Sequence, residues 1–399
     1  MITQEINDRL TRTGPGTPMG TLMRRYWQPI AGAEDLDRDP VQPVRLMGEE
    51  LVLFRDASGK LGLVGNRCAH RGISLAYGIP QENGLRCAYH GWTYNTQGQV
   101  VDMPFEPACL PLKITSYPVQ TLGGLVFAYL GPDPAPLLPR YDLFVRDDVD
   151  RMIEITVLPC NWLQCMDNGV DPIHFEHLHG HFGNYVLKKL GKPPMLNTAS
   201  HLKIEFDRFK YGIIKRRLVE GEPEDCDDWT TGHPILFPNI LSVGDVRRPN
   251  YQIRVPIDDT HTLHVRYQAI LRPEAAEPKL EIPVSHVNLF DEDGKPLLDP
   301  ADIPSQDMLA WVAQGPIIDR TQEHLATSDK GVAMYHNLLL EQTEVAMRGE
   351  DPMAVIRDPE ENEPYIVIPR EKKGYRAFFT IDGVYKEPER AETRGIAKV

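Results

Sequence analysis

The sequence predicts an α+β fold in two parts, a small β-rich unit followed by a larger domain of strands and helices. Residues 27–130 contain short apolar runs separated by turn signals, a pattern typical of β structure. The proline-rich stretch 131–139 then favours extended backbone, as expected of a connection between domains. Beyond it, strand-like and helix-like segments alternate, which indicates an α+β domain.

In the β-rich unit, the apolar runs 51–54 and 61–64 flank a turn at 56–59, and a third run covers 124–130. We expect no helix of useful length in this unit. The larger domain is predicted to contain more elements, with a polar tail after the last of them. They are a strand at 153–158, a helix from 161 to about 179, several strands between about 201 and 271, a helix from about 305 into the region of 319, and a helix from about 330 to 348.

The composition of the chain argues against several classes of protein. The chain of 399 residues has 43 basic and 57 acidic residues, a formal charge of −14, which argues against a general nucleic-acid-binding protein. The beginning of the sequence lacks the features of a signal peptide and no apolar run is long enough for a membrane span, so we expect a cytoplasmic protein. Six cysteines are too few for a disulfide scaffold, and a cysteine grouped with histidines therefore favours a metal site.

Two cysteine–histidine pairs form the first candidate site: Cys68 with His70, and Cys87 with His90. Thiolates and imidazoles together suit either zinc or an iron–sulfur cluster, and the spacing alone does not separate these options. A glycine follows each pair, at 72 and 91, and permits a tight loop whose backbone N–H groups can approach the sulfurs. This composition favours a redox cluster slightly.

The run Cys-x-His-Arg-Gly, followed by Cys-x-Tyr-His-Gly-Trp, resembles the Rieske [2Fe–2S] motif. The resemblance implies that Cys68 and Cys87 bind one iron, and that His70 and His90 bind the other, solvent-facing iron. A zinc site is the alternative. The remaining cysteines have no such partners and are expected to be structural thiols: Cys109, Cys160, Cys165 and Cys226.

The second candidate site lies at the start of the larger domain, where Asp171 precedes His174, His177 and His179. Two imidazoles and one carboxylate are what a non-haem Fe(II) oxygenase needs on one face of its metal. On an ideal helix His174 and His177 face alike, whereas His174 and His179 are about 140° apart. A π-bulge, or a helix end near Gly180, would bring His179 round.

The pattern Asp-x-x-His-x-x-x-x-His resembles the mononuclear-iron motif of Rieske oxygenases. It implies that His174 and His179 bind the iron and that His177 is structural or a neighbour of the ligands. It also implies that Asp171 links His90 of one chain to His174 of another. A carboxylate at a helix start is the alternative interpretation of Asp171.

Proximity in sequence cannot identify the third ligand. The region from Asp307 to residue 325 resembles the C-terminal signature of the phthalate-dioxygenase-like and aromatic O-demethylase branch, which implies that Asp307 is the ligand. Asp302 and Asp319 are the alternative ligands. The structural alternative is that Asp307 is simply an exposed carboxylate on a helix. The segment 12–27 resembles the same branch, so the resemblance covers almost the whole chain.

One segment departs from the branch: residues 311–314 read Trp-Val-Ala-Gln where relatives commonly have Gln-Glu-Ser-Met. If Trp311 approaches the pocket, its bulk would alter the shape of that pocket. The substrates of relatives therefore cannot simply be transferred.

The resemblance also implies an architecture and a reaction. It implies an all-β Rieske domain at 27–131 and a catalytic domain at 1–26 and 140–399, built on an antiparallel sheet with a helix-grip (START-like) fold. The chain would be the terminal oxygenase (alpha) subunit, using O2 and electrons that a ferredoxin-type reductase takes from NAD(P)H. A homotrimer or hexamer would follow.

Hydroxylation or O-demethylation of a lignin-type aromatic carboxylate is the expected reaction. The alternatives are a ring dioxygenase that makes cis-dihydrodiols from a phthalate-like acid and, from a different class, a redox carrier or zinc-binding protein that uses only the first site. A carboxylate substrate needs a local cation. The basic runs 215–217 and 247–248 are candidates, although an exposed basic face explains them better.

Overall fold

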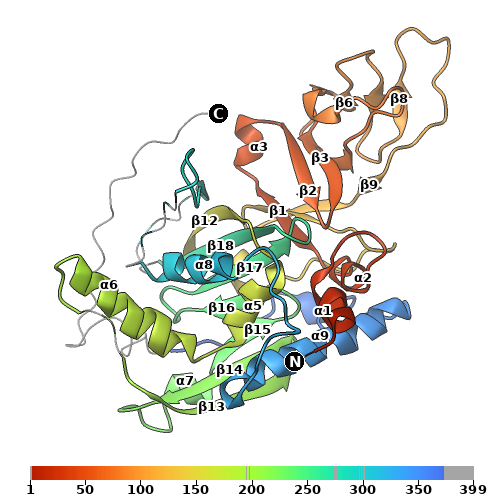
Figure 1. Cartoon of the computed structure of the whole chain (residues 1–399). Helices are drawn as coiled ribbons and strands as arrows, with labels where there is room; N and C mark the ends of the chain where they lie inside the picture. Colours follow the sequence, from red (N-terminus) through yellow and green to blue (C-terminus); the bar gives the residue numbers. More distant parts are fainter. Residues whose placement is uncertain are drawn as a thin grey trace.

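The computed structural model describes residues 2–194, 196, 198–272, 277, 279, 281–295, 297, 299 and 302–372. The end of the predicted domain 140–399 and its polar tail, from 373 on, lie outside them. The chain forms a β-rich part beside a domain built on a large sheet, so the predicted α+β fold is confirmed (Figure 1).

The β-rich part contains three small antiparallel sheets, with strand orders β1-β11-β10, β2-β3-β4-β9 and β5-β6-β7-β8. Short helices only, α3 (Asp35–Arg38) and η1 (Leu75–Tyr77), interrupt it, as expected. The predicted runs 51–54 and 61–64 pair as neighbouring strands. The strands are β1 (Gln28–Gly32), β2 (Val41–Leu46), β3 (Glu49–Arg55), β4 (Leu61–Gly65), β5 (Ile79–Gln81), β6 (Gly84–Arg86), β7 (Thr93–Tyr94), β8 (Val100–Asp102), β9 (Ser116–Tyr117), β10 (Val119–Leu122) and β11 (Leu125–Ala128).

The larger domain is built on an eight-stranded sheet with the order β13-β14-β15-β16-β17-β18-β12-β19. All neighbours are antiparallel except β12 and β19, which run parallel at one edge. The strands are β12 (Val149–Leu158), β13 (His201–Phe209), β14 (Gly212–Val219), β15 (His233–Leu236), β16 (Ile240–Val243), β17 (Asn250–Pro256), β18 (Thr262–Leu271) and β19 (Val284–Val287).

The single helix predicted from 161 to about 179 is wrong, because the structure divides it. Helix α5 (Trp162–Val170) ends where Asp171 adopts an extended conformation, with φ −82° and ψ 124°. Pro172 causes the break, since it lacks an N–H and disfavours helical backbone in the residue before it. The π-helical segment η2 (Phe175–Phe182) follows, and α6 (Gly183–Lys189) continues from it.

The predicted helix from about 305 into the region of 319 is shorter than expected, because α8 (Ile303–Ala313) ends before Gly315 and Pro316. Gly315 has a φ of +86°, a left-handed conformation that suits glycine. The predicted helix at 330–348 is confirmed as α9 (Lys330–Met347). The remaining helices are α1 (Gln4–Thr11), α2 (Pro18–Met23), α4 (Asp142–Val145), α7 (Asp227–Thr230), η3 (Thr327–Asp329) and α10 (Pro359–Asn362).

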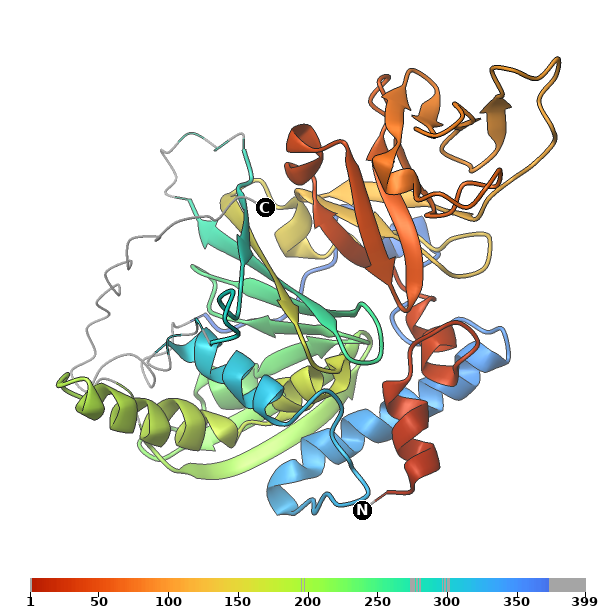
Figure 2. The ribbon, with the colours of Figure 1, turned by 45° about the horizontal axis from the view of Figure 1, so that its top comes forward.

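The two parts share apolar packing. One cluster of buried side chains combines strands of the β-rich part with α5, α9 and the large sheet, whereas a smaller cluster surrounds Cys68 and Cys87. The turn between β2 and β3 also docks on the sheet, because the N–H groups of Met47 and Gly48 donate to carbonyls at the end of β17. In both ribbon views the β5–β8 sheet projects away from the large sheet (Figure 1, Figure 2).

The proline-rich stretch 131–139 contains no helix or strand, as predicted, but it is not a free linker. Trp27 donates its indole N–H to the carbonyl of Pro136, and Leu137 donates its N–H to the carbonyl of Ile356. The connection is therefore packed against the residue that precedes β1 and against the segment that follows α9.

Candidate active site

The two cysteine–histidine loops have the same backbone structure. The N–H of each cysteine donates to the carbonyl five residues later, at 3.0 Å for Cys68 and 2.8 Å for Cys87. Each cysteine carbonyl accepts from the glycine four residues later, Gly72 or Gly91. Both glycines have positive φ, +72° and +79°, which a residue with a Cβ rarely adopts.

The side chains of these loops form two layers. Cys68 and Cys87 are buried, whereas His70 and His90 are exposed with their ring centroids 4.5 Å apart. The hydroxyl oxygen of Tyr94 lies 3.1 Å from Sγ of Cys68. Two buried thiols beneath two exposed imidazoles fit a [2Fe–2S] cluster whose imidazole-bound iron faces solvent.

The second site brings together His174, His179 and Asp307. Oδ1 of Asp307 lies 3.6 Å from Nε2 of His174 and 3.2 Å from Nε2 of His179. One ligand atom from each residue lies within 4.8 Å of those of the other two. Asp307 comes from α8, and the histidines come from the end of the α5–η2 connection and from η2. Two imidazoles and a carboxylate on one side of a metal fit non-haem Fe(II).

The π-helical conformation of η2 explains how His174 and His179 can converge. An i→i+5 hydrogen-bond pattern brings residues five apart towards the same face, as the predicted π-bulge requires. His177, expected to be structural or a neighbour of the ligands, has a side chain that is 64% exposed, and its ligand atoms group with those of Glu176 and His181.

Polar neighbours hold two of these residues. Oδ2 of Asp171 lies 3.3 Å from Nδ1 of His174, and the Asp171 carboxylate also accepts from the backbone N–H groups of Ile173 and His174. It therefore serves as a carboxylate at the start of a helical segment and as the neighbour of a histidine. Asn168 donates to Oδ1 of Asp307 at 3.2 Å.

Gln306 holds the third residue. Its Oε1 lies 2.8 Å from Nδ1 of His179, so Nδ1 carries a proton, and Nε2, on the side of Asp307, is the nitrogen left for a metal. Burial alone would raise the pKa of Asp307, but the adjacent His179 and His174 outweigh burial and lower that pKa to about 2. A carboxylate that stays ionised suits a cation.

The alternative carboxylates are engaged elsewhere. Asp302 caps α8, because its Oδ2 accepts from the N–H of Ser305 at 3.1 Å. Asp319 accepts from the N–H and hydroxyl of Thr321 in a turn.

Three buried polar side chains next to the second site were not identified from the sequence. Arg254 of β17, His264 of β18 and Thr156 of β12 form one cross-strand row. Trp311, one helical turn beyond Asp307 on α8, packs over this row, with its ring 5.3 Å from both the Arg254 guanidinium and the His264 ring.

Several polar atoms of this group lack a hydrogen-bond partner in the described part of the chain: Nε of Arg254, both ring nitrogens of His264 and Nε1 of Trp311. Burial lowers the pKa of Arg254 to about 10, so its guanidinium stays charged at neutral pH. In the sequence, Arg254 stands between isoleucine and valine, a pattern that also describes a strand with one solvent-facing residue, so the sequence could not identify it.

The basic runs named from the sequence lie in different surroundings. Lys215 and Arg217 are buried, so the exposed-face interpretation is wrong for them. Lys215 donates to the carbonyl of Gly169 at the end of α5, and Arg217 pairs with Asp228. Arg247 is 71% exposed, as expected of a surface residue.

The cysteines outside the first site are free thiols. Cys160 and Cys165 are buried with their sulfurs 3.7 Å apart. Cys160 directly precedes the N-cap Asn161 and Cys165 is the fourth residue after it. Apolar side chains at these two positions commonly pack together at a helix start. Cys226 is partly buried, whereas Cys109 is exposed.

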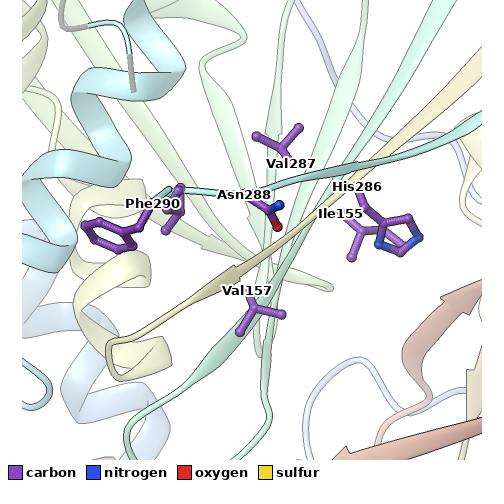
Figure 3. A pocket seen from close by; sticks show the side chains of 7 residues that line it. Ile155, Val157, His286, Val287, Asn288 and Phe290 are labelled. Carbon is purple, nitrogen blue, oxygen red and sulfur yellow. The ribbon is translucent and has the colours of Figure 1, made fainter. Parts of the chain in front are cut away.

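A cavity of about 260 Å³ opens at the sheet edge, between β12 and the segment after β19 (Figure 3). Leu289 and Phe290 line it and also pack in the apolar cluster of Met308 and Trp311, so the cavity adjoins the wall of the second site. The other lining residues are Ile155, Val157, His286, Val287 and Asn288.

Comparison with known proteins identifies a domain family and several relatives of this chain. Residues 26–118 match the Rieske [2Fe-2S] domain. The chain is 43% identical over 372 residues to the 5,5'-dehydrodivanillate O-demethylase oxygenase subunit of Sphingobium sp. (strain NBRC 103272 / SYK-6), covering 91% of this chain and 85% of that protein. It is 30% identical over 396 residues to the phthalate 4,5-dioxygenase oxygenase subunit of Pseudomonas putida, covering 88% of each.

Among solved structures, the terminal oxygenase of carbazole 1,9a-dioxygenase from Novosphingobium sp. KA1 matches with a TM-score of 0.61 and 20% identity, covering 84% of this chain and 97% of that one. That match supports the fold. Within the described residues, no helix combines the length and apolar character needed to span a membrane.

Proposed function

Because this chain belongs to the Rieske non-haem iron oxygenases, as a terminal oxygenase subunit, we propose that it oxidises a lignin-type aromatic carboxylate by O-demethylation or hydroxylation. The 43% identical relative named as an O-demethylase subunit supports O-demethylation first. A ring dioxygenase acting on a phthalate-like acid is the second candidate, favoured by the relative named as phthalate 4,5-dioxygenase.

Enzymes of this family use a Rieske [2Fe–2S] cluster that supplies single electrons from a reductase, and a mononuclear iron that activates O2. We propose that Cys68, Cys87, His70 and His90 hold the cluster. The buried position of both thiols and the facing exposed imidazoles support this assignment. The matching left-handed glycines let the loop backbone turn tightly around each thiol.

His174, His179 and Asp307 are the proposed ligands of the mononuclear iron. Their support is the convergence of three ligand atoms at one place, together with the neighbours Asn168 and Gln306 that orient two of the side chains. A facial set of three protein ligands leaves the opposite side open for O2 and substrate.

Asp171 is the proposed link between subunits. Its carboxylate lies beside Nδ1 of His174, so it can hold that ring while accepting a hydrogen bond from another chain. The β5–β8 sheet, which carries the loop of Cys87, projects away from the sheet whose helices carry the second site, and this favours delivery of electrons from a neighbouring subunit (Figure 2). A homotrimer or hexamer would provide that neighbour, with a ferredoxin-type reductase as the electron donor.

The observation that carries the substrate class is the buried guanidinium of Arg254. Its two Nη atoms donate to the backbone carbonyl and the side-chain oxygen of Gln252, which are neutral, and its Nε has no partner among the described residues. The charge is therefore costly to bury unless a counter-charge arrives. A substrate carboxylate would supply that charge, and the N–H of Trp311 offers a further donor. The adjacent apolar side chains of Leu158, Leu289 and Met308 would pack against the aromatic ring and exclude water.

The two candidate reactions release different products. Iron-loaded protein with a compatible reductase should consume O2 with methoxylated aromatic acids and release an equal amount of formaldehyde. Hydroxylated product without formaldehyde would identify a ring hydroxylase instead.

The role of Arg254 is tested with substrate analogues in which an uncharged amide replaces the carboxylate. If the acid and its amide were turned over with the same KM, Arg254 would not recognise the carboxylate.

Removing the side chain of Asp307 tests the ligand assignment. Asp307→Ala should lose mononuclear iron and turnover while it keeps the visible spectrum of the cluster, because the two sites use different ligands. Total iron per chain and the visible spectrum, measured together, check this. An unchanged iron content would reject Asp307 as the ligand.

Location and domain boundaries complete the proposal. The four cysteines outside the proposed cluster are free thiols, which supports a reducing compartment, the cytoplasm. We place a Rieske domain at 27–131 and a catalytic domain at 1–26 and 140–399. Contacts of the N-terminal segment support its assignment to the catalytic part, because Arg9 pairs with Glu344 of α9 and Arg25 donates to the carbonyl of Ala346.

A further inference from the structure

The exposed face of η2 carries its own group of metal-ligating side chains, none of which belongs to the proposed iron site. His177 and His181 are four residues apart, and their rings are nearly parallel, with centroids 5.6 Å apart and an interplanar angle of 21°. Both histidines are exposed. One ligand atom each from Glu176, His177 and His181 lie within 4.8 Å of one another.

Glu176 is already held in place. Its Oε2 accepts from the backbone N–H of His201 at 2.9 Å and lies 3.0 Å from Nδ1 of that ring. Its Oε1 lies 4.0 Å from Nε2 of His177. A cation would therefore meet a carboxylate whose side chain has already lost its freedom, which lowers the entropic cost of binding.

The π-helical backbone separates this group from the inner one. His174 and His179, five residues apart, turn inward to Asp307, whereas His177 and His181 lie on the exposed side. The two groups share no residue, so each can hold its own cation.

We propose that Glu176, His177 and His181 form a second, solvent-facing site for a divalent transition metal, with Zn²⁺ as its probe. Two imidazole nitrogens, one carboxylate oxygen and a water molecule complete the four-coordinate set that Zn²⁺ prefers. The same donors would bind Cu²⁺ more tightly than Zn²⁺, and Mg²⁺ and Ca²⁺ poorly, because imidazole suits the transition metals. A metal at this place ties together three residues of the segment that also carries His179.

Titration calorimetry of the full-length, iron-loaded protein with Zn²⁺ tests the site. We expect one equivalent per chain at this site, with the mononuclear iron content and the visible cluster spectrum unchanged. His177→Ala and His181→Ala should each weaken this binding at least tenfold. His324→Ala is the matched control, since His324 is also exposed but lies outside η2, and it should bind Zn²⁺ as the parent does.

A further variant separates the two metal sites. Asp307→Ala, which removes a proposed iron ligand, should still bind Zn²⁺ at the outer site with the affinity of the parent. Zn²⁺ binding that persists in His177→Ala and His181→Ala, or that disappears in Asp307→Ala alone, would overturn the proposal. Equal weakening in His324→Ala would do so too, because it would indicate general surface binding.

Discussion

Gln306 and Asp307 are neighbours in the sequence, yet they contact the second site in different ways. Asp307 faces both histidines, whereas Gln306 accepts a hydrogen bond from the far nitrogen of His179. The amide therefore selects which nitrogen of His179 is free to bind a metal. A residue that contacts no metal can control how well the site binds one.

Gln306→Leu should weaken mononuclear iron binding by about 10–100-fold, because leucine fills the space of the amide but cannot accept from Nδ1. Competition with an iron chelator, with the cluster spectrum as an internal reference, measures the change. Gln164→Leu is the matched control: Gln164 is equally buried but donates to backbone carbonyls of Trp311 and Gly315. If both variants lose iron equally, Gln306 acts only through the stability of the fold.

His264 makes stability depend on pH. Burial, and then the adjacent Arg254, hold the pKa of His264 well below its ordinary value, so the folded ring stays neutral while the unfolded ring can take up a proton. Its contribution to stability is present above the unfolded pKa of about 6.5 and is lost as the pH falls. Between pH 7.5 and 5.5 the loss is about 1.4 kcal/mol.

Denaturant unfolding at the two pH values measures this loss. His264→Gln should lose less stability on acidification than the parent, and His324→Gln, at an exposed position, should behave as the parent does. Identical pH dependence in the parent and His264→Gln would show that the ring is not neutral in the fold.

The residues of the two sites differ in how far the sequence could identify them. The resemblance predicted His174, His179 and Asp307 as one ligand set, although helical spacing favoured His174 with His177, and the structure brings the three predicted residues together. Arg254 could not be found in this way, since only the pairing of β17, β18 and β12 reveals that it lies on the buried face beneath Trp311.

At the scale of elements, the sequence predicted most strands and helices but misplaced two helix boundaries. The signals for both breaks were local, in Pro172 and in the pair Gly315 and Pro316, but the run of polar and apolar residues beyond them suited a continuing helix. The division of the first helix matters for function, because it frees Asp171 from helical backbone and starts the segment that carries the histidines.

Gly331 of α9 shows how tightly these elements pack. A Cβ there would lie 2.3 Å from the Phe206 ring of β13 and 2.8 Å from the carbonyl oxygen of Val170, at the end of α5. Gly331→Ala should therefore destabilise the protein by about 1–2 kcal/mol, because overpacking exceeds the gain of about 1 kcal/mol in helix propensity.

The urea midpoint of unfolding checks this, with Gly169→Ala of α5 as the control. A Cβ at Gly169 would make only ordinary contact, 3.5 Å from Nη1 of Arg254, so its stability should hold or rise slightly. A Gly331→Ala variant as stable as Gly169→Ala would mean that β13 and α9 can move apart at little cost.

At the scale of the whole molecule, the β-rich part has its own small core around the cysteine loops, but another of its faces packs into the core of the catalytic part. Both Leu51 and Leu53 of β3, and Val126 of β11, belong to that shared core. Residues 27–131 expressed alone should expose these side chains, bind a hydrophobic dye and associate. A monomer with dispersed NMR signals and no dye binding would contradict this.

The β2–β3 turn that docks on the end of β17 has a consequence for engineering. Chimeric oxygenases are attractive because an electron-accepting module from one enzyme could, in principle, be grafted onto the catalytic module of another. Here the joint includes backbone hydrogen bonds from Met47 and Gly48 as well as apolar side chains from both modules. If the modules were exchanged at the proline-rich connection alone, surfaces from two different parents would meet at this interface. A working chimera should therefore take both surfaces of the interface from the same parent.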